Sequence, residues 1–461
     1  MSGKHRTNGQ RAGQAGGSAA HSASGGDTST QPLAILGARL IDGTGADPIE
    51  HSALVIEGER ISAVGPRARV TVPRGAVVIE ADGASILPGL IDCHVHLTGD
   101  WLYPLRHLLT PPSLQLLYSV PNCRATLEAG ITTVRDAGGT PAAVKMAVER
   151  GLFVGPRMQV AVSFLSQTGG HGDHLMPCCV DLGQPLPADV PRGVVDGVDQ
   201  MRRVSREVLR AGADWLKLCT SGGVLSSADA PTSPQFTVEE IAVAVYEAST
   251  HNKRCMAHAQ STQGIKNALR AGIASIEHGI WLDDEAIAFM IEHGVYLVPT
   301  LKAPEDVIRA AEAHPDLLPA YAVEKSRAVM ADHRASFRRA VAAGVKVAMG
   351  TDTGVGPHGE NAQELALMVQ HGMTPMQSIV ASTRTAAELL RMEHDVGTLA
   401  VGMLADVLLV NGDPLVDIAR LADPARRALV LKGGMPVSGS LLIAGGLATR
   451  QPSISSAAQK I

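Results

Sequence analysis

Six residues whose side chains suit divalent metal ions occur along the chain, each at or just past the end of a short apolar run. Imidazole, carboxylate and modified amine groups can bind such ions, and bound ions activate water for hydrolysis. Because parallel strands of one β/α fold direct their carboxyl ends to one rim, we expect these side chains to meet there. The spacing therefore predicts a metal-dependent hydrolase with the ligands His94, His96, Lys217, His258, His278 and Asp352.

The first two ligands form a His-x-His pair. A Pro-Gly turn at residues 88–89 leads into an apolar run that ends on His94 and His96. Side chains two residues apart on a strand lie on the same face. Both imidazoles should therefore point to the interior, where they would bind one metal ion, while Val95 packs outward.

Lys217 lies in an otherwise apolar run, and alternation places it on one face with Trp215 and Cys219. A buried charge costs free energy unless it is paired. One explanation is an ion pair with a carboxylate, or a side chain that extends to solvent. The other is that burial and metal charge lower the pKa of the amine, so that it reacts with carbon dioxide to form a carbamate bridging two metal ions. The second explanation predicts a binuclear centre.

His258 and His278 end consecutive runs, and we expect them to bind the second metal ion. Asp352 ends the last run, where an Asp can also cap a helix. We favour a ligand role for Asp352, together with a catalytic one. Its carboxylate would accept a proton from an activated water, whose pKa a zinc-type centre lowers to about 7.

His171 lies in a long glycine-flanked loop after the third run. We predict that it is catalytic and either hydrogen-bonds the substrate carbonyl or binds a substrate carboxylate. The alternative is a loop histidine that faces solvent. Arg135, Arg157 and His174 are further candidates for structural or substrate contacts.

The elements that must position these residues follow from the middle of the chain, where short apolar runs alternate with amphipathic helical windows. This pattern is typical of βαβ units around a parallel sheet, and eight runs predict an α/β fold, a closed (β/α)8 barrel of the TIM type over residues 85–391. Ala-Gly pairs at 129–130, 211–212, 271–272 and 343–344 stand where helices should end. The runs are Leu90–His96, Thr132–Asp136, Met158–Phe164, Asp214–Cys219, Arg254–His258, Ala274–His278, Val295–Pro299 and Val345–Asp352.

Both ends of the chain carry shorter β-type runs between Gly, Pro and Asp turns. We predict that residues 32–84 and 392–450 together form a small β-sandwich, with strands at Leu33–Ile41 and Gly397–Leu399 among its members. Residues 1–31 are rich in Gly, Ser, Ala, Thr and Gln, so we predict a disordered tail. Residues 451–461 form a C-terminal tail.

Composition narrows the class of partner. The net charge of -5 is spread without a basic cluster, so nucleic acid is not an expected partner. Without a long apolar segment or an apolar signal sequence we expect no membrane association and a cytoplasmic protein. The six cysteines lack Cys-x-x-Cys spacing, which predicts reduced thiols. The expected partner is a small-molecule substrate.

Four further motifs carry a resemblance to a known family. Over about residues 33–440 the chain resembles the amidohydrolase superfamily, in the imidazolonepropionase-related branch that includes Xaa-Pro-type dipeptidases and amidases acting on ochratoxin-like compounds. The resemblance implies a barrel with a β-sandwich of both termini, N6-carboxylated Lys217, two divalent ions (zinc, or else manganese or cobalt) and a homo-oligomer. The motifs are Pro-Gly-Leu-Ile-Asp-Cys-His-Val-His at 88–96, Gly-Ile-Thr-Thr-Val-Arg-Asp at 130–136, Gly-Gly-His-Gly-Asp at 169–173, and the segment 397–406.

The same residues suggest a mechanism. A hydroxide that bridges two metals would attack an amide carbonyl, and Asp352 would pass the proton to the departing nitrogen. The expected substrate is a dipeptide or an N-acyl amino acid. The alternative is a carbamate, thiocarbamate or phenylurea xenobiotic, with a single metal ion if Lys217 is not carboxylated.

Two other functions are less well supported by the residues. A deaminase of the superfamily would typically carry a His-x-x-Glu acid near the fifth strand, yet Ser261 stands three residues beyond His258. Deamination would also leave Lys217 without a role. A non-catalytic relative would be expected to have lost ligands, and all six are present.

Overall fold

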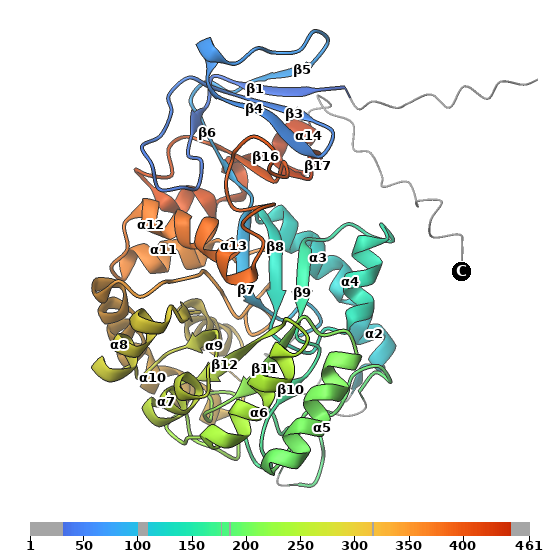
Figure 1. Ribbon diagram of the computed structural model, residues 1–461, viewed down its shortest axis with the longest axis vertical. Coiled ribbons are helices and arrows are strands. Elements are labelled where there is room, and N and C mark those ends of the chain that lie inside the picture. The colour runs from blue at the N-terminus through green and yellow to red at the C-terminus, as the bar shows by residue number, and fades with distance from the viewer. Residues whose placement is uncertain (1–30, 100–108, 177, 184–185, 316–317, 444–461) are drawn as a thin grey trace, which may run out of the picture. The chain divides into compact units, whose positions relative to one another are not determined.

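Parallel strands from the middle of the chain lie side by side (Figure 1). The computed structural model describes residues 31–99, 109–176, 178–183, 186–315 and 318–443; the predicted tails fall outside these ranges, apart from Gln31. Three strands form one sheet: β7 (Leu90–Val95), β8 (Ile131–Asp136) and β9 (Arg157–Val160). Five form a second: β10 (Phe164–Leu165), β11 (Trp215–Cys219), β12 (Arg254–Ala259), β13 (Ser275–His278) and β14 (Tyr296–Val298).

The two parallel sheets are joined at both edges. At one edge the Asp214 amide, just before β11, donates to the Val160 carbonyl of β9. At the other, the run 345–353 forms parallel bridges from Val347 to Leu297 of β14 and from Thr353 to Val95 of β7. The parallel runs thus follow one another in space in the order in which they occur along the chain.

Helices alternate with these strands, as the apolar periodicity predicts. The four Ala-Gly pairs stand at helix C-termini. Gly344 directly follows its helix, one alanine separates each of the other three glycines from its helix, and the φ values are 86°, 94°, 90° and 87°. This conformation is the left-handed C-cap that glycine adopts at low cost, so the predicted helix ends are confirmed. The helices are α2 (Pro112–Leu117), α3 (Ser119–Glu128), α4 (Ala142–Glu149), α5 (Gly197–Arg210), α6 (Val238–Ser249), α7 (Thr262–Arg270), α8 (Asp284–His293), α9 (Lys302–Ala313), α10 (Ala320–Ala343), α11 (Gln363–Gln370), α12 (Pro375–Ala381) and α13 (Arg384–Leu390).

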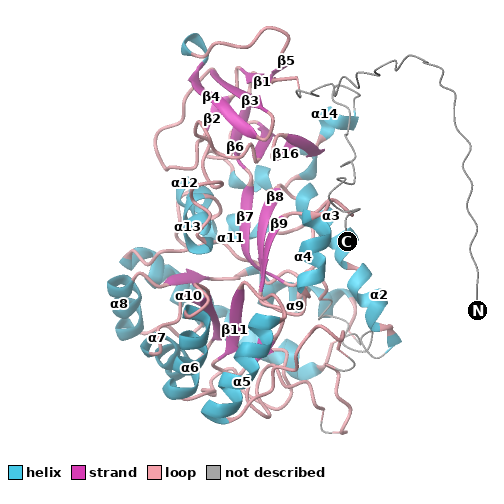
Figure 2. Cartoon of the chain, turned by 45° about the vertical axis from the view of Figure 1, so that its right-hand side comes forward, coloured by secondary structure: helices cyan, strands magenta, loops and turns pink. Residues whose placement is uncertain are grey.

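Two further sheets hold strands from the ends of the described chain (Figure 2). One has the order β4 (Arg60–Pro66), β3 (Ser52–Glu57), β1 (Leu33–Leu36), β5 (Val77–Glu80). The other mixes both ends, in the order β17 (Met435–Ser438), β16 (Arg427–Lys432), β15 (Val407–Asn411), β6 (Ala84–Pro88), β2 (Arg39–Leu40), and α14 (Ser440–Ile443) follows β17. Apolar side chains of both sheets, such as Ile35, Leu54, Ile86 and Leu409, share one buried cluster. Because β6 belongs to this sheet, the sheet extends past residue 84, where the predicted β-sandwich segment ends.

Two strands predicted for the terminal sheets are wrong in detail. The run Leu33–Ile41 is not one strand but β1 and β2, which belong to different sheets, because Gly37 turns the chain with φ at 86°. Residues 397–399 form no strand, and the Leu399 amide instead donates to the Asp42 carbonyl in a loop contact.

Two predicted barrel strands are also irregular. The third run divides into β9 and β10 at Val162, whose φ of 64° interrupts the extended backbone. The eighth run, Val345–Asp352, forms no regular strand in the described structure. Val347 bridges to Leu297, Thr353 just beyond the run bridges to Val95 and Gly356, and Asp352 has a left-handed φ of 60°. Both departures occur near the carboxyl ends of the runs, where the candidate site lies.

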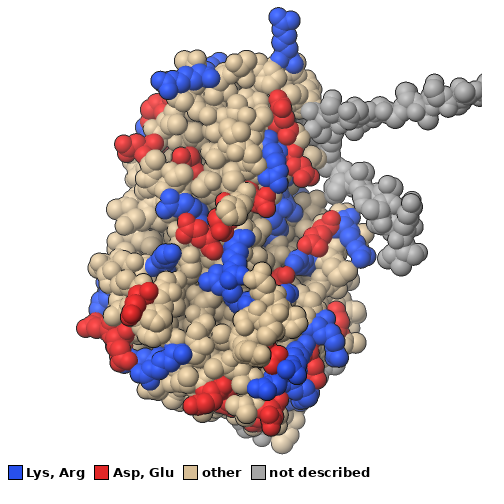
Figure 3. Space-filling model, in the orientation of Figure 1, with Lys and Arg blue, Asp and Glu red and all other residues tan. Residues whose placement is uncertain are grey.

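Two observations concern the described helices and the surface charge. None of the described helices combines the length and apolar character needed to cross a bilayer. On the face shown in Figure 3, acidic and basic side chains are interspersed and no broad basic area forms.

Leu409 tests whether the shared core of the terminal sheets supports the fold. Its side chain is 2% exposed, and replacing a buried Leu with Ala costs about 2–5 kcal/mol. We expect Leu409→Ala to lower the midpoint of thermal unfolding by several degrees. Val416→Ala, at a position 81% exposed, is the matched control and should change it little. Equal midpoints for the two variants would contradict the assignment of Leu409 to this core.

Candidate active site

A cavity of about 470 Å³ lies at the carboxyl ends of the parallel strands. Its wall contains each of the six residues singled out in the sequence as metal ligands, and also His171 and His174. The ligands are buried or nearly so, which separates their charges from bulk solvent. The predicted convergence of these side chains is therefore present: His94, His96, Lys217, His258, His278 and Asp352 line one space.

Strand register explains this convergence. Lys217 and Cys219 alternate along β11 and both face the cavity, whereas Trp215 lies against the guanidinium of Arg135 at 4.7 Å from its ring centroid. In the register of β11 with β12, His258 lies opposite Cys219. In the register of β12 with β13, His278 lies opposite Ala259, the residue after His258. Each strand thus brings its ligand to a similar height.

The Asp352 carboxylate lies among the imidazoles. Its Oδ1 is 3.1 Å from Nε2 of His96 and 3.4 Å from Nε2 of His94. One donor atom each from His94, His278 and Asp352 lies within 4.8 Å of the others, a spacing that suits a shared metal ion. The Nζ of Lys217 is 3.4 Å from Nε2 of His94.

Hydrogen bonds at the back of each ring indicate which nitrogen faces the cavity. Nδ1 of His94 lies 2.7 Å from a Glu277 oxygen, and Nδ1 of His96 lies 2.8 Å from the Gly138 carbonyl. Nδ1 of His278 lies 2.7 Å from the Thr300 hydroxyl. A carboxylate or carbonyl only accepts, so Nδ1 of His94 and His96 must donate. In a neutral ring this leaves the Nε2 lone pair facing Asp352, and a cation between these acceptors would stabilise the arrangement.

Burial also keeps the candidate ligands in the forms that metals bind. Burial, followed by the charge of Lys217, lowers the pKa of His94 to about 4. Burial likewise holds the pKa values of His258 and His278 well below the usual range and lowers that of Lys217. For Asp352 burial acts in the opposite direction, but His94 and His96 hold its pKa well below that of an ordinary carboxyl group. His96 differs, because the hydrogen bond and charge of Asp352 outweigh burial and raise its pKa. The neutral imidazoles of His94, His258 and His278 beside an ionised carboxylate fit a divalent ion.

His258 lies beside the other ligands in a different orientation. Its ring is 4.6 Å from that of His278, and its Nε2 lies 3.0 Å from the Gly222 carbonyl. Donation from Nε2 leaves Nδ1 as the nitrogen available to a metal. His258 therefore fits a ligand role through the other ring nitrogen.

Two of the candidate ligands have strained backbones. His278 and Asp352 have φ values of 71° and 60°, and this region costs a non-glycine residue roughly 1–2 kcal/mol. Hydrogen bonds hold both in place: His333 Nε2 lies 3.1 Å from the His278 carbonyl, and the Asp352 amide donates to the His94 carbonyl at 2.8 Å. Such strain concentrates at functional sites.

Glu277 was missed by the sequence reasoning. It is fully buried and contacts Nδ1 of His94, while Arg135 donates to both of its oxygens at 2.8 and 3.0 Å. Burial alone would raise the pKa of Glu277, but Arg135 and His94 lower it, so the carboxylate is ionised. Arg135 is therefore a structural residue: it holds Glu277, and Glu277 orients the candidate ligand His94. A carboxylate inside the apolar run 274–278 was the available signal.

Asp92 was missed as well. It accepts hydrogen bonds from the Thr351 hydroxyl at 2.7 Å and from the Asn361 amide at 2.8 Å. Burial raises its pKa to about 6. The contact fixes the residue next to Asp352 onto β7, which carries His94.

His171 packs face to face on His258, with ring centroids 4.1 Å apart. Its Nδ1 lies 2.9 Å from the Ser226 hydroxyl, which also contacts Asp229, and its backbone amide donates to Gln235. A side chain at Gly223 would meet the His171 ring at 2.2 Å, so this close approach requires glycine. His171 is thus an ordered part of the wall.

The loop that carries Ser226 is fastened to α10. The Nζ of Lys325 donates to three of its carbonyls, those of Gly223, Ser226 and Asp229, at 3.2, 2.7 and 2.6 Å. Lys325 thus positions the loop over the cavity.

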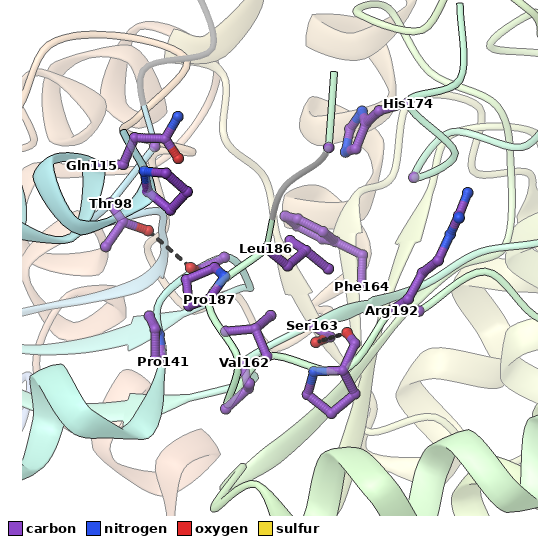
Figure 4. Close-up of a pocket in the computed structure, with 18 of the residues that line it drawn as sticks. Thr98, Gln115, Pro141, Val162, Ser163, Phe164, His174, Leu186, Pro187 and Arg192 are labelled. Carbon is purple, nitrogen blue, oxygen red and sulfur yellow. Dashed lines mark hydrogen bonds between the residues drawn. The ribbon is translucent and has the colours of Figure 1, made fainter. Parts of the chain in front are cut away.

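A smaller cavity of about 130 Å³ adjoins the first (Figure 4). Phe164 and His174 line both cavities, with ring centroids 6.4 Å apart in an edge-on arrangement. In Figure 4 they lie near Leu186, opposite Thr98 and Pro141. His174 is therefore placed at the boundary between the two spaces, whereas Arg157 lies elsewhere and donates to Asp406.

Glu277→Gln tests how His94 is held. The change keeps the side-chain shape but leaves the buried Arg135 charge uncompensated, which costs roughly 3–5 kcal/mol. We expect a lower thermal unfolding midpoint and a zinc affinity reduced about 10–100-fold in competition with a chelator, because His94 loses its charged partner. The double variant Arg135→Met/Glu277→Gln should recover much of the stability but not the affinity. Wild-type zinc affinity in Glu277→Gln would rule out this role.

Comparison with known proteins agrees with this geometry. The model of the amidohydrolase family matches residues 85–437. Ochratoxinase of Aspergillus niger is 34% identical over 410 residues, which cover 86% of this chain and 84% of that protein. The crystal structure of A. niger ochratoxinase gives a TM-score of 0.80 at 33% identity and covers 92% of this chain and 99% of that chain. The crystal structure of a Xaa-Pro dipeptidase with bound methionine gives 0.79 at 32% identity, covering 89% and 100%. Imidazolonepropionase of Geobacillus sp. (strain WCH70) is 23% identical over 391 residues, covering 79% and 84%. This chain belongs to the amidohydrolase family, in the branch of these relatives, and is a hydrolase that acts on carbon–nitrogen bonds.

Proposed function

We propose that this protein is a metal-dependent hydrolase that cleaves a C–N amide bond in a small molecule. The observation that carries the proposal is the Asp352 carboxylate lying 3.1 and 3.4 Å from two imidazole nitrogens whose opposite ring positions are already hydrogen-bonded. The fold proposed with it is a closed (β/α)8 barrel, with a β-sandwich built from both ends of the chain. The bridges at Val347 and Thr353 support the closure.

The proposed cofactors are two divalent metal ions, zinc first and manganese or cobalt as alternatives. When bound, such ions polarise a carbonyl group and lower the pKa of water to about 7. His94, His96, His258, His278 and Asp352 would hold them. These donors suit zinc because they combine imidazole nitrogens with a carboxylate.

Lys217 completes the proposed ligand set after N6-carboxylation. The neutral amine would add to carbon dioxide, forming an N–C bond and releasing one proton, and the carbamate would supply two oxygen donors. Burial supports this step because it lowers the Lys217 pKa. The carboxylates nearest to Lys217 are engaged elsewhere, Glu277 with Arg135 and Asp352 with His96. An unmodified Lys217 would favour the one-metal alternative.

Asp352 and His171 are the proposed catalytic residues. The Asp352 carboxylate would take the proton of the attacking water and deliver it to the departing nitrogen, which must leave as a neutral amine. His171, held by Ser226 at Nδ1, would use its other ring nitrogen to bind the substrate carbonyl or a substrate carboxylate.

The proposed substrate is a dipeptide or an N-acyl amino acid. One observation favours the alternative of a neutral carbamate, thiocarbamate or phenylurea. Among the described residues that line the cavity there is no arginine, and the single lysine is Lys217. A substrate carboxylate would therefore bind without an arginine, to donors of the wall such as His171, His174 or the Tyr321 hydroxyl.

Metal removal tests the proposal directly. We expect dialysis against a chelator to abolish release of amine or amino acid from a panel of dipeptides, N-acyl amino acids, aryl carbamates and ureas, and zinc to restore it. Asp352→Asn should lower kcat about 10²–10⁴-fold even with zinc present, because the proton acceptor is lost. Full activity of metal-free protein would refute the proposal.

Ser226→Ala tests the catalytic role of His171. Without the hydroxyl, Nδ1 loses its partner and the ring is less well oriented, so we expect kcat/KM to fall about tenfold at unchanged metal content. Ser249→Ala is the control, because that exposed hydroxyl only bonds the Tyr246 carbonyl in α6. If both variants keep wild-type kcat/KM, His171 does not depend on this contact.

A further inference from the structure

One buried side chain of α10 binds the ends of two neighbouring strands. His333 is 2% exposed, and its Nε2 lies 2.8 Å from the Pro299 carbonyl and 3.1 Å from the His278 carbonyl. A carbonyl oxygen only accepts, so Nε2 must carry the hydrogen and donate to both. The regular pairing of β13 with β14 ends at Glu277 and Val298, one residue before these two carbonyls. The N–H group of His333 thus connects the two strands where their own ladder stops.

The backbone is strained at both of these strand ends. His278 and Thr300 have φ values of 71° and 51°. This left-handed region is costly for residues other than glycine, and most of all for a β-branched one such as threonine. His333 holds the carbonyl of His278 itself and the carbonyl of Pro299, which belongs to the peptide leading into Thr300. One donor therefore supports both strained positions.

The same two strand ends carry the partners of a hydrogen bond that orients the candidate ligand His278. Its Nδ1 lies 2.7 Å from the Thr300 hydroxyl. Each partner stands at the end of its own strand, so the contact depends on the height of one strand end relative to the other. A donor that binds both ends keeps this relative height fixed. His333 can therefore act on the ring of His278 through the backbone.

The next turn of α10 reaches only one of the two strands. The Ser336 hydroxyl donates to the Gly279 carbonyl at 2.7 Å and accepts from the Leu282 amide at 3.2 Å. Both partners lie in the segment that follows β13. Among the described side chains of α10, only that of His333 bonds to the ends of both strands.

We propose that His333 is a positioning residue for the metal centre: its N–H group holds the ends of β13 and β14 at the relative height at which His278 binds a metal ion. The inference rests on the proposed function, because it takes His278 as a ligand. It requires a donor at one atom, not only a side chain of suitable size. A side chain that fills the space without a donor should therefore fail, and one that places an N–H group there should serve.

His333→Met and His333→Gln separate the donor from the bulk of the side chain. Gln can place an amide N–H near the position of the histidine Nε2, whereas Met fills similar space without a donor. In competition with a chelator, we expect the zinc affinity of the full-length protein to fall about 10–100-fold in His333→Met, the usual effect of losing a contact that orients a metal ligand. The affinity of His333→Gln should stay near that of the wild type.

Phe337→Leu controls for a general loss of stability. Phe337 lies one turn further along α10, is 1% exposed and belongs to the main core, but it does not line the larger cavity. A smaller side chain there should lower the thermal unfolding midpoint and leave the zinc affinity unchanged. If His333→Met does not fold, His333→Asn replaces it, because its shorter side chain cannot reach both carbonyls.

Hydrogen exchange of the metal-free protein gives a measurement that needs no bound ion. The Gly279 amide follows His278 directly and donates to the Ala259 carbonyl. Without the donor of His333 this segment should open more often, so we expect exchange in residues 279–282 to be about tenfold faster in His333→Met. Exchange in His333→Gln should match that of the wild type.

Lower zinc affinity and faster exchange in His333→Met, both restored in His333→Gln, support the proposal. Wild-type affinity in His333→Met, or an equal loss in His333→Gln or Phe337→Leu, overturns it, because the donor then has no particular role. If the wild type itself binds no zinc, the proposed function fails and the exchange rates decide this inference. Faster exchange in His333→Met alone then supports the hold of His333 on the strand ends, and equal rates in both variants overturn it.

Discussion

The Asp352 carboxylate, placed between the Nε2 atoms of His94 and His96, is the contact on which the rest of the site depends. It joins the last parallel run to the first, and the Asp352 amide repeats the connection by donating to the His94 carbonyl. Both contacts hold Asp352 in its left-handed backbone conformation. The contacts that hold the last run against the first therefore also bring the carboxylate of Asp352 to the imidazoles.

A second constraint is that so many ionisable groups are buried together. Arg135, Glu277, Lys217 and Asp352 all lie within a few contacts of His94. Burying charges is costly unless each is paired, and Glu277 with Arg135 meets this condition within the protein. The acceptors that face the cavity are not paired with cations within the protein, and this is the physical reason to expect bound cations there.

Much of this site could be predicted from the sequence because it follows from strand periodicity. Alternation placed His94 with His96 and Lys217 with Cys219, and the Ala-Gly pairs marked the helix ends. Glu277 escaped the same reasoning. Adjacent residues of a strand should face opposite ways, yet Glu277 and His278 both approach His94, because the φ of 71° at His278 breaks the strand there.

Other features depend on contacts that have no local signal. The kink at Val162 and the irregular eighth run arise from left-handed backbones of non-glycine residues, which sequence patterns do not mark. The contact from Ser226 to His171 joins two loops 55 residues apart.

Anomalous diffraction from crystals of the zinc-loaded protein, recorded on both sides of the zinc absorption edge, tests the central claim most directly. The account predicts two anomalous peaks enclosed by His94, His96, Lys217, His258, His278 and Asp352, with electron density for a carbamate on Lys217. Zinc bound elsewhere on the protein, with no peak among these six side chains, would contradict it.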